Sequence, residues 1–177
     1  MEIRTLTGRE AIASGLAERI LDLDRANMRA VFDAAGIDFP EEKRRRGMGG
    51  STLIVAFDGE SVAGYVEFQR SWRDPANLYI GSIQVDQRHR GGRLMLRLLD
   101  QLRRLVATED FRGFETSVQK VNAPAVRMYR KIGFTLEPNP ENDASWIAKA
   151  GRDLLTRSPV IPLLERWSRH GAARDGG

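Results

Sequence analysis

Residues 78–108, which read LYIGSIQVDQRHRGGRLMLRLLDQLRRLVAT, decide how the rest of this chain is arranged. The run Leu78–Val85 is apolar and rich in β-branched and aromatic residues, which predicts a buried strand. From Arg93 onward leucines recur at helical spacing, which predicts a long amphipathic helix. Between the two, Asp86–Gly92 is a charged segment with two adjacent glycines. The stretch therefore indicates a strand that leads into a helix through a tight turn.

The turn before the predicted helix has the features of a phosphate-binding site. The first N–H groups of a helix lack partners within the helix, and the helix dipole is positive at that end. Five basic or potentially basic side chains surround the turn: Arg88, His89, Arg90, Arg93 and Arg97. Two interpretations stay open on these residues alone, a seat for a phosphate-bearing cofactor and a solvated turn in an arginine-rich protein.

The composition is that of one soluble globular domain. The chain has 177 residues, of which 41% are hydrophobic and 29% are charged. Cysteine is absent, which excludes disulfides, thiol catalysis and cysteine-ligated zinc, and we expect no metal cofactor. No apolar run approaches the roughly 18 residues that cross a bilayer, and the N-terminus lacks the pattern of a signal peptide. We therefore expect no membrane segment and a cytoplasmic, bacterial-like protein.

The charge balance gives little support to nucleic acid as the main ligand. The net charge is +4, and the basic residues are mostly arginine, as a GC-rich genome would also encode. The run 43–46, KRRR, could contact nucleic acid, but a charged loop is the commoner meaning of so short a run. The chain has no zinc-finger spacing, RNA-binding aromatic signature or extended basic tail.

Periodicity along the chain predicts a layered α/β domain with a mixed sheet and no second domain. A helical stripe of Leu16, Ile20, Leu23, Met28 and Val31 predicts one mostly helical segment over residues 8–35. Residues 37–50 are a connector with a short helix after Pro40, either a mobile loop that closes over a substrate or an ordinary surface loop. The expected strands are residues 2–6, 51–57, 61–72, 78–85, 114–118, 134–137 and 144–150, and the expected later helices begin at Arg93 and Ala125.

The segment Asn122–Phe134, NAPAVRMYRKIGF, resembles the second motif of the GNAT superfamily of acetyl-CoA-dependent N-acetyltransferases. The matching residues are Asn122, Ala123, Ala125, Tyr129, Lys131, Gly133 and Phe134. The spacing from Val85 through Arg90 and the Leu98–Leu99 helix is also similar, and the resemblance covers residues 51–150 well and the first 50 loosely. It implies one GNAT-like domain over residues 1–177, with a core at 51–150 and a helical tail at 151–170. The implied fold is a mixed, mostly antiparallel sheet of six to seven strands with helices on both faces.

The turn departs from the family's pattern at two positions. That pattern has small residues where this chain has Arg93 and Met95. If the first of these positions requires a positive φ, arginine there would be strained, unless Gly91 or Gly92 takes that conformation instead. The phosphate seat would then be shifted or weaker, although Arg93 could add a phosphate contact of its own.

The resemblance implies acetyl-CoA as the acyl donor and direct transfer to a primary amine in a ternary complex. Backbone groups at Ile83, Gln84 and Val85 would pair with the pantetheine arm like an added strand. Asn122, with Ala125 beside it, would bind near the sulfur end, and Tyr129 would protonate the leaving thiolate. Two plainer roles stay open, an N-cap for Asn122 and helix packing for Tyr129. The implied pyrophosphate-binding residues are Arg88, His89, Arg90, Gly91, Gly92, Arg93 and Leu94.

The general base is less well defined by the sequence. The organising strand contains no glutamate, although family members often carry one there. Glu67 on the preceding strand is the first candidate, because its neighbours Val66 and Phe68 point to the opposite face. Glu115 is a second candidate and an ordered water a third. A solvated or salt-bridged Glu67 without a catalytic role fits the same pattern.

The acceptor is not defined by the sequence beyond an amine-bearing molecule. Two other functions fit the same residues: a non-catalytic acetyl-CoA-binding sensor, and a toxin that acetylates aminoacyl-tRNA. The apolar residues of the tail between Leu154 and Trp167 need cover, and a second subunit could supply it in a homodimer.

Overall fold

A computed structural model of the chain describes residues 1–90 and 93–154. The strands are β1 (Glu2–Thr7), β2 (Thr52–Asp58), β3 (Ser61–Arg70), β4 (Asn77–Val85), β5 (Gly113–Gln119), β6 (Thr135–Pro138) and β7 (Ser145–Gly151). The helices are α1 (Gly8–Ala13), α2 (Leu16–Ala35), α3 (Glu41–Met48), the 3-10 turn η1 (Gln87–His89), α4 (Leu94–Leu105) and α5 (Ala123–Lys131).

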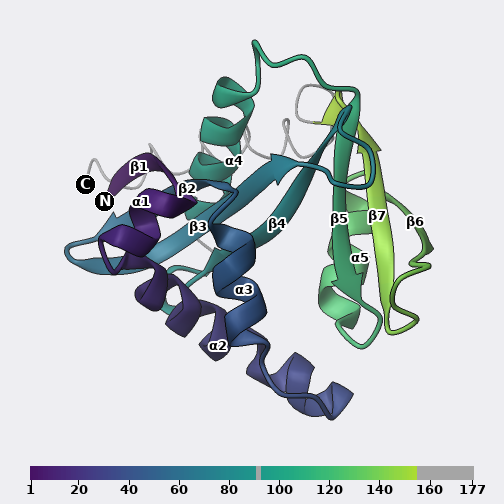
Figure 1. The fold of residues 1–177 in the computed structure, drawn as a ribbon, viewed down its shortest axis with the longest axis horizontal. Helices are drawn as coiled ribbons and strands as arrows, with labels where there is room; N and C mark the ends of the chain where they lie inside the picture. The colour runs from purple at the N-terminus through teal and green to yellow at the C-terminus, as the bar shows by residue number, and fades with distance from the viewer. Residues whose placement is uncertain (91–92, 155–177) are drawn as a thin grey trace, which may run out of the picture.

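The seven strands form one mixed sheet in the order β1-β2-β3-β4-β5-β7-β6. Every neighbouring pair is antiparallel except β4 and β5, which are parallel. In Figure 1 the half made of β1–β4 and the half made of β5–β7 meet at one end of β4 and diverge toward the other. The predicted fold class, a mixed and mostly antiparallel sheet with helices on both faces, is confirmed.

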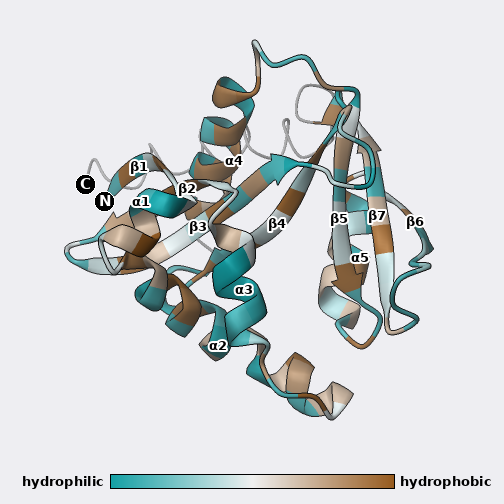
Figure 2. Ribbon diagram, in the orientation of Figure 1, coloured by the Kyte–Doolittle hydropathy of each residue, from teal (hydrophilic) through white to brown (hydrophobic). Residues whose placement is uncertain are grey.

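Two hydrophobic cores cover the two faces of the sheet. One joins α4 and α5 to the strands, and Leu94, Leu98 and Leu102 of α4 are buried in it. The other joins α1 and the first half of α2 to β2 and β3, with Ile20 and Leu21 fully buried. Figure 2 shows the resulting amphipathic helices, and α3 as the most hydrophilic of them. The alternation predicted for β3 is confirmed, because Val66 and Phe68 lie in the α4 core while Tyr65 lies in the α2 core.

Residues 8–35, predicted to be mostly helical, form two helices, α1 and α2. A capping box starts α1, with the Thr7 side chain accepting from the Glu10 amide at 3.2 Å. Gly15, with φ 73°, then separates α1 from α2. A left-handed residue cannot continue a right-handed helix, so the chain turns there. Gly36 ends α2 with φ 65°, as its predicted role as a C-cap requires.

The connector at residues 37–50 is a packed helix for most of its length. The short helix expected after Pro40 is α3, and its last residue, Met48, is fully buried in the α2 core. Other boundaries differ slightly: β3 ends at Arg70 rather than at residue 72, and β7 includes Gly151. The expected tail between Leu154 and Trp167 lies outside the described residues after Leu154 itself.

Gly8 holds the start of α1 against the end of α3, which gives a stability prediction. A Cβ at this position would lie 1.7 Å from the Met48 carbonyl oxygen, inside backbone that cannot easily move. We expect Gly8→Ala to lower the free energy of unfolding by about 2 kcal/mol in urea titrations. Gly47→Ala is the matched control, because a Cβ there meets nothing within 4 Å. Because Gly47 lies in the last turn of α3, the control should stabilise by at most about 0.5–1 kcal/mol. Equal effects of the two substitutions would contradict the prediction.

Among the described helices, none combines the length and the apolar character that crossing a membrane requires.

Candidate active site

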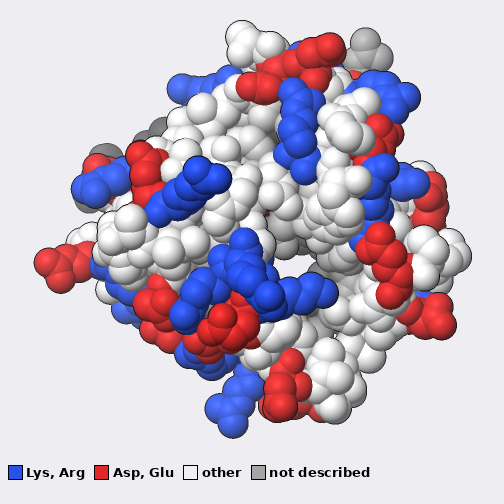
Figure 3. Space-filling model, viewed as in Figure 1, with Lys and Arg blue, Asp and Glu red and all other residues white. Residues whose placement is uncertain are grey.

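The divergence of β4 and β5 opens a cavity through the sheet. The two strands pair only where Asn77–Tyr79 faces Gly113–Glu115. Beyond this point a cavity of about 1330 Å³ is lined by both strands and by residues of α2, α4 and α5. Figure 3 shows the hollow between the two halves, with Lys and Arg side chains at its rim over α2 and α3. Small-molecule sites usually measure about 300–1,000 Å³, so this cavity has room for a large ligand or for two ligands side by side.

The far edge of β4 presents backbone groups to this cavity. The Asp86 N–H donates to Ala63 of the β3 side at 2.9 Å, while the Val85 carbonyl faces away from β3 and accepts from Asn27 at 3.1 Å. Backbone groups of an antiparallel strand alternate in direction, so Ile83 also faces the opening. The edge at Ile83–Val85 therefore faces the cavity, although its Val85 carbonyl already accepts from Asn27 and from Arg90 Nε at 3.4 Å.

The turn after β4 is built by Asp86. Its carboxylate accepts from the Arg88 N–H at 2.8 Å and from Arg88 Nε at 3.0 Å. These hydrogen bonds from Arg88 lower the pKa of Asp86. Arg93 has φ −81°, so the strain considered for arginine at this position does not arise. Gly91 and Gly92 lie outside the described residues.

A second, basic cavity of about 340 Å³ lies at the start of α4. Arg93, the N-cap of α4, makes no side-chain capping bond to the first turn. Arg90 and Arg93 line both this cavity and the larger one, so the two adjoin. Helix N-terminus and guanidinium groups together suit a diphosphate. The residues that line this smaller cavity are Met1, Arg88, His89, Arg90, Arg93, Leu94 and Arg97.

All described residues of the predicted cofactor set line one or both of these cavities. The larger cavity is lined by Ile83, Gln84, Val85, Arg90, Arg93, Asn122, Ala125 and Tyr129. Arg88, His89 and Leu94 line the smaller one. Asn122 also caps α5, because its Oδ1 accepts from the Ala125 N–H at 3.2 Å. The two roles considered for Asn122 are therefore compatible in one side chain.

Tyr129 of α5 is held against the cavity wall. Its ring packs edge-on to Phe134, with centroids 5.1 Å apart, and its hydroxyl is hydrogen-bonded to Thr116 of β5. Thr116 Oγ1 in turn donates to the Ile80 carbonyl of β4 at 2.8 Å, so Thr116 connects the Tyr129 hydroxyl to both strands at the opening. Burial raises the pKa of Tyr129 above its usual value. The phenol is therefore protonated at neutral pH and able to donate a proton.

Glu67 is buried beside the cavity rather than exposed in it. Its carboxylate accepts from Arg44 Nη2 at 2.7 Å and from the Ser51 hydroxyl at 2.9 Å. The carboxylate packs over Gly81, a cavity-lining residue where β4 bulges, and a Cβ on Gly81 would lie 3.1 Å from it. Glu115, the second candidate base, is also buried, and it accepts from the Ser71 hydroxyl.

Asp24 is a carboxylate of this region that the sequence reasoning missed. It is 2% exposed, lines the cavity, and accepts from Arg44 Nε at 3.0 Å and from the Tyr65 hydroxyl. Burial raises the pKa of Asp24, against the opposite effects of Arg44 and Tyr65. The available signal was its spacing, because Asp24 lies four residues after Ile20 and four before Met28 on the predicted apolar stripe.

Comparisons with known proteins agree with this geometry. A model of the acetyltransferase (GNAT) family matches residues 12–134, which is more than half of the chain. A streptothricin acetyltransferase from Escherichia coli is 31% identical over 86 residues, or 49% of this chain and 48% of that protein. The chain thus spans about half the length of this curated relative.

Solved structures share the fold at low sequence identity. A PaiA N-acetyltransferase from Thermoplasma acidophilum, solved in complex with coenzyme A, is 15% identical, with 85% of this chain and 99% of that chain covered and a TM-score of 0.62. An acetyltransferase from Streptococcus agalactiae is also 15% identical, with 85% and 97% covered and a TM-score of 0.64. These structures show the shared fold, and the family match over residues 12–134 shows that the chain belongs to the acetyltransferase (GNAT) family.

Proposed function

We propose that this protein transfers the acetyl group of acetyl-CoA to a primary amine by direct transfer in a ternary complex. The observation that carries the proposal is one continuous path: the basic cavity at the start of α4 adjoins the larger cavity, which leads along the β4 edge to Tyr129. The diphosphate would lie in the basic cavity, the pantetheine arm along the β4 edge, and the thioester beside Tyr129. The family membership supports the same reading.

The residues supply the groups that the reaction needs. The amine nitrogen attacks the thioester carbonyl, so a C–N bond forms and the C–S bond breaks. In our proposal Tyr129 gives its proton to the leaving thiolate, and a proton leaves the amine toward Glu67 through a water beside Gly81. A water is needed because the Glu67 carboxylate lies behind Gly81. The products are an amide and free coenzyme A, and the proton accepted by Glu67 returns through water to Tyr129. An acceptor that enters as ammonium releases one further proton to solvent.

The test combines binding and turnover on the full chain. Calorimetry with coenzyme A should show saturable heat, and acetyl-CoA with an amine should release free thiol in an amine-dependent way. The panel includes streptothricin, after which the E. coli relative is named, a peptide N-terminus, a lysine side chain and an aminoacyl-tRNA. Heat without thiol release from any amine would favour the sensor function. Release with aminoacyl-tRNA alone would favour the toxin function.

The proposed role of Glu67 predicts a specific change in pH dependence. Glu67→Gln keeps the size of the side chain and its contact with Ser51 but removes the proton acceptor. We expect the turnover number to fall about tenfold at pH 7 and to recover partly at higher pH, where more of the amine is already neutral. Glu137→Gln, an exposed change on β6, serves as the control. An unchanged pH profile of Glu67→Gln would remove Glu67 from proton transfer.

A further inference from the structure

We propose that Asp24 binds the ammonium group of the acceptor and that the second half of α2 binds an apolar stem attached to it. The acceptor class is then a primary alkyl or arylalkyl amine. This inference rests on the proposed function for the identity of the cavity, but its evidence lies on the α2 side rather than on the cofactor side.

The apolar stripe of α2 divides at Asp24. Before this residue, Ile20 and Leu23 are buried in the core against the sheet. After it, Met28 and Val31 are only half-buried and line the cavity. Asp24, Met28 and Val31 share one face of the helix, and the rise of 1.5 Å per residue places Val31 about 10 Å beyond Asp24. One wall of the cavity is therefore acidic at its inner end and apolar outward.

Two aromatic rings extend the apolar part of this wall. Phe32 of α2 and Phe39, which precedes α3, both line the cavity. Their rings meet edge to face, with centroids 5.6 Å apart and an interplanar angle of 86°. Both side chains are half-buried, so an apolar stem lying between them and Met28 would remove further apolar surface from water.

The charges around Asp24 favour a cationic ligand. Asp24 and Glu67 both bind the same guanidinium, at 2.9 and 2.7 Å from Arg44 Nη2. Tyr65 is the other titratable group in this network, and its phenol donates to Asp24. The network thus holds two carboxyl groups and only one guanidinium, so it has one acidic group more than it has cations. A buried charge is costly unless it is paired, and an ammonium would complete the pairing.

Binding to the wild-type protein tests the inference without turnover. Calorimetry in saturating coenzyme A compares phenethylamine and hexylamine with phenethyl alcohol, which has the stem but no charge. We expect the amines to bind at least about tenfold more tightly than the alcohol. Equal binding of amine and alcohol, or no heat from either amine at millimolar concentration, would overturn the proposal. If the amines bind but no thiol is released with acetyl-CoA, the proposed function fails while this inference stands.

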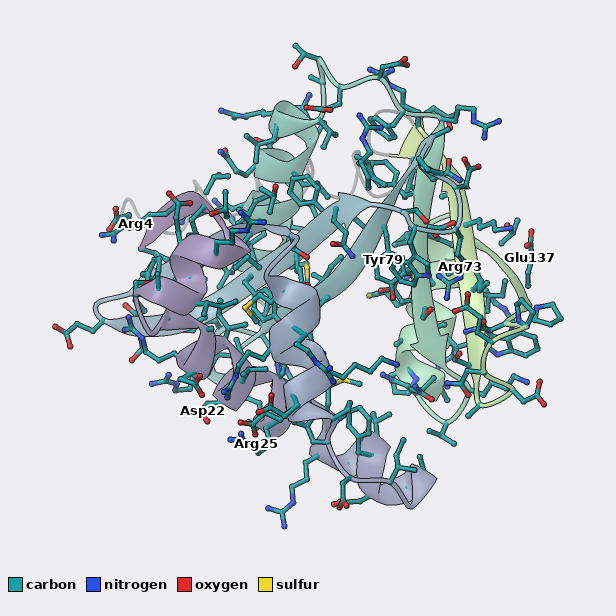
Figure 4. All side chains as sticks on the ribbon, viewed as in Figure 1. Arg4, Asp22, Arg25, Arg73, Tyr79 and Glu137 are labelled. Carbon is teal, nitrogen blue, oxygen red and sulfur yellow. The ribbon has the colours of Figure 1, made fainter. Side chains whose placement is uncertain are left out.

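Substitution of Asp24 separates ligand recognition from folding. Asp24→Asn removes the charge, and its amide oxygen can still accept from Tyr65, so we expect the Kd for phenethylamine to rise about tenfold with coenzyme A binding unchanged. Asp22→Asn is the matched control, because Figure 4 shows Asp22 on the side of α2 away from β5, where it pairs with Arg25. An unchanged Kd for the amine in Asp24→Asn would contradict the proposal, and Asp24→Glu should restore part of the amine affinity.

Discussion

Tyr129→Phe is expected to lower the turnover number about 100-fold while the Kd for coenzyme A stays within about twofold of wild type. The substitution removes only the hydroxyl, and the ring keeps its edge-on contact with Phe134. The hydroxyl is the group that our proposal assigns to protonation of the leaving thiolate. Stopped-flow measurement of thiol release, with calorimetry on the same preparation, separates the chemical step from cofactor binding.

Tyr79→Phe is the control for this prediction. Tyr79 lies on β4 near the junction with β5, but its ring packs edge-on against Trp72, with centroids 4.5 Å apart, and lies under the Arg73 guanidinium. Figure 4 shows Tyr79 and Arg73 together on the side of β4 that faces β5 and β7. Removal of the Tyr79 hydroxyl should leave the turnover number nearly unchanged. If Tyr129→Phe turned over as fast as Tyr79→Phe, Tyr129 would have only the packing role that the sequence also allowed.

The pH dependence of turnover at alkaline pH is a second test of the role of the Tyr129 hydroxyl. Because burial raises the pKa of Tyr129 above its usual value near 10, the acid form persists through the neutral and mildly alkaline range. Wild-type turnover should therefore show no loss from tyrosine ionisation below about pH 10. A fall in turnover centred near pH 8, absent from Tyr129→Phe, would contradict the raised pKa.

The parts of the fold that depend on local sequence were predictable. The apolar run at Leu78–Val85 and the leucine spacing after Arg93 determine a strand and a helix by themselves, and both are present. The motif at Asn122–Phe134 identified the family, which no periodicity could have done. Gly15 was missed as a break because a single glycine inside a helical pattern is often tolerated, and only its φ of 73° shows that it ends the helix.

The acceptor side could not be predicted because it depends on how distant segments dock. The sequence placed Glu67 on the face of β3 opposite Val66 and Phe68, as the structure has it. Its partner Arg44 lies on α3, and in the sequence alone Arg44 is one residue of a basic run. The same docking brings Asp24 to Arg44 across 20 residues. The only local sign of this network was the position of Asp24 within an apolar helical stripe. An aspartate exposed to solvent at that position would produce the same sequence pattern.

Arg44→Met should lower the free energy of unfolding by about 3–5 kcal/mol, since it leaves two buried carboxylates without their shared cation. Asp24 and Glu67 are each 2% exposed, so without the guanidinium water would solvate the two carboxylates only weakly. The facing groups Tyr65, Glu67 and Asp24 raise the pKa of Arg44 above its usual value, although burial alone would lower it. The guanidinium is therefore charged at every pH at which the protein is folded, and its loss is not masked by titration. Urea unfolding at pH 7 measures the effect.

The pH dependence of this loss distinguishes buried charge from lost packing. Burial already raises the folded-state pKa of Asp24, and without Arg44 the opposing effect of the guanidinium on this carboxyl would be lost. A group with a raised folded-state pKa loses its contribution to stability as pH rises, so the deficit of Arg44→Met should be larger at pH 8 than at pH 5. Arg46→Met, on the exposed face of α3, should cost less than about 1 kcal/mol at either pH. Adding Asp24→Asn to Arg44→Met should recover part of the loss at pH 8, because one of the two uncompensated charges is gone. A deficit that is equal at both pH values and unaffected by Asp24→Asn would mean that Arg44 stabilises the fold by packing alone.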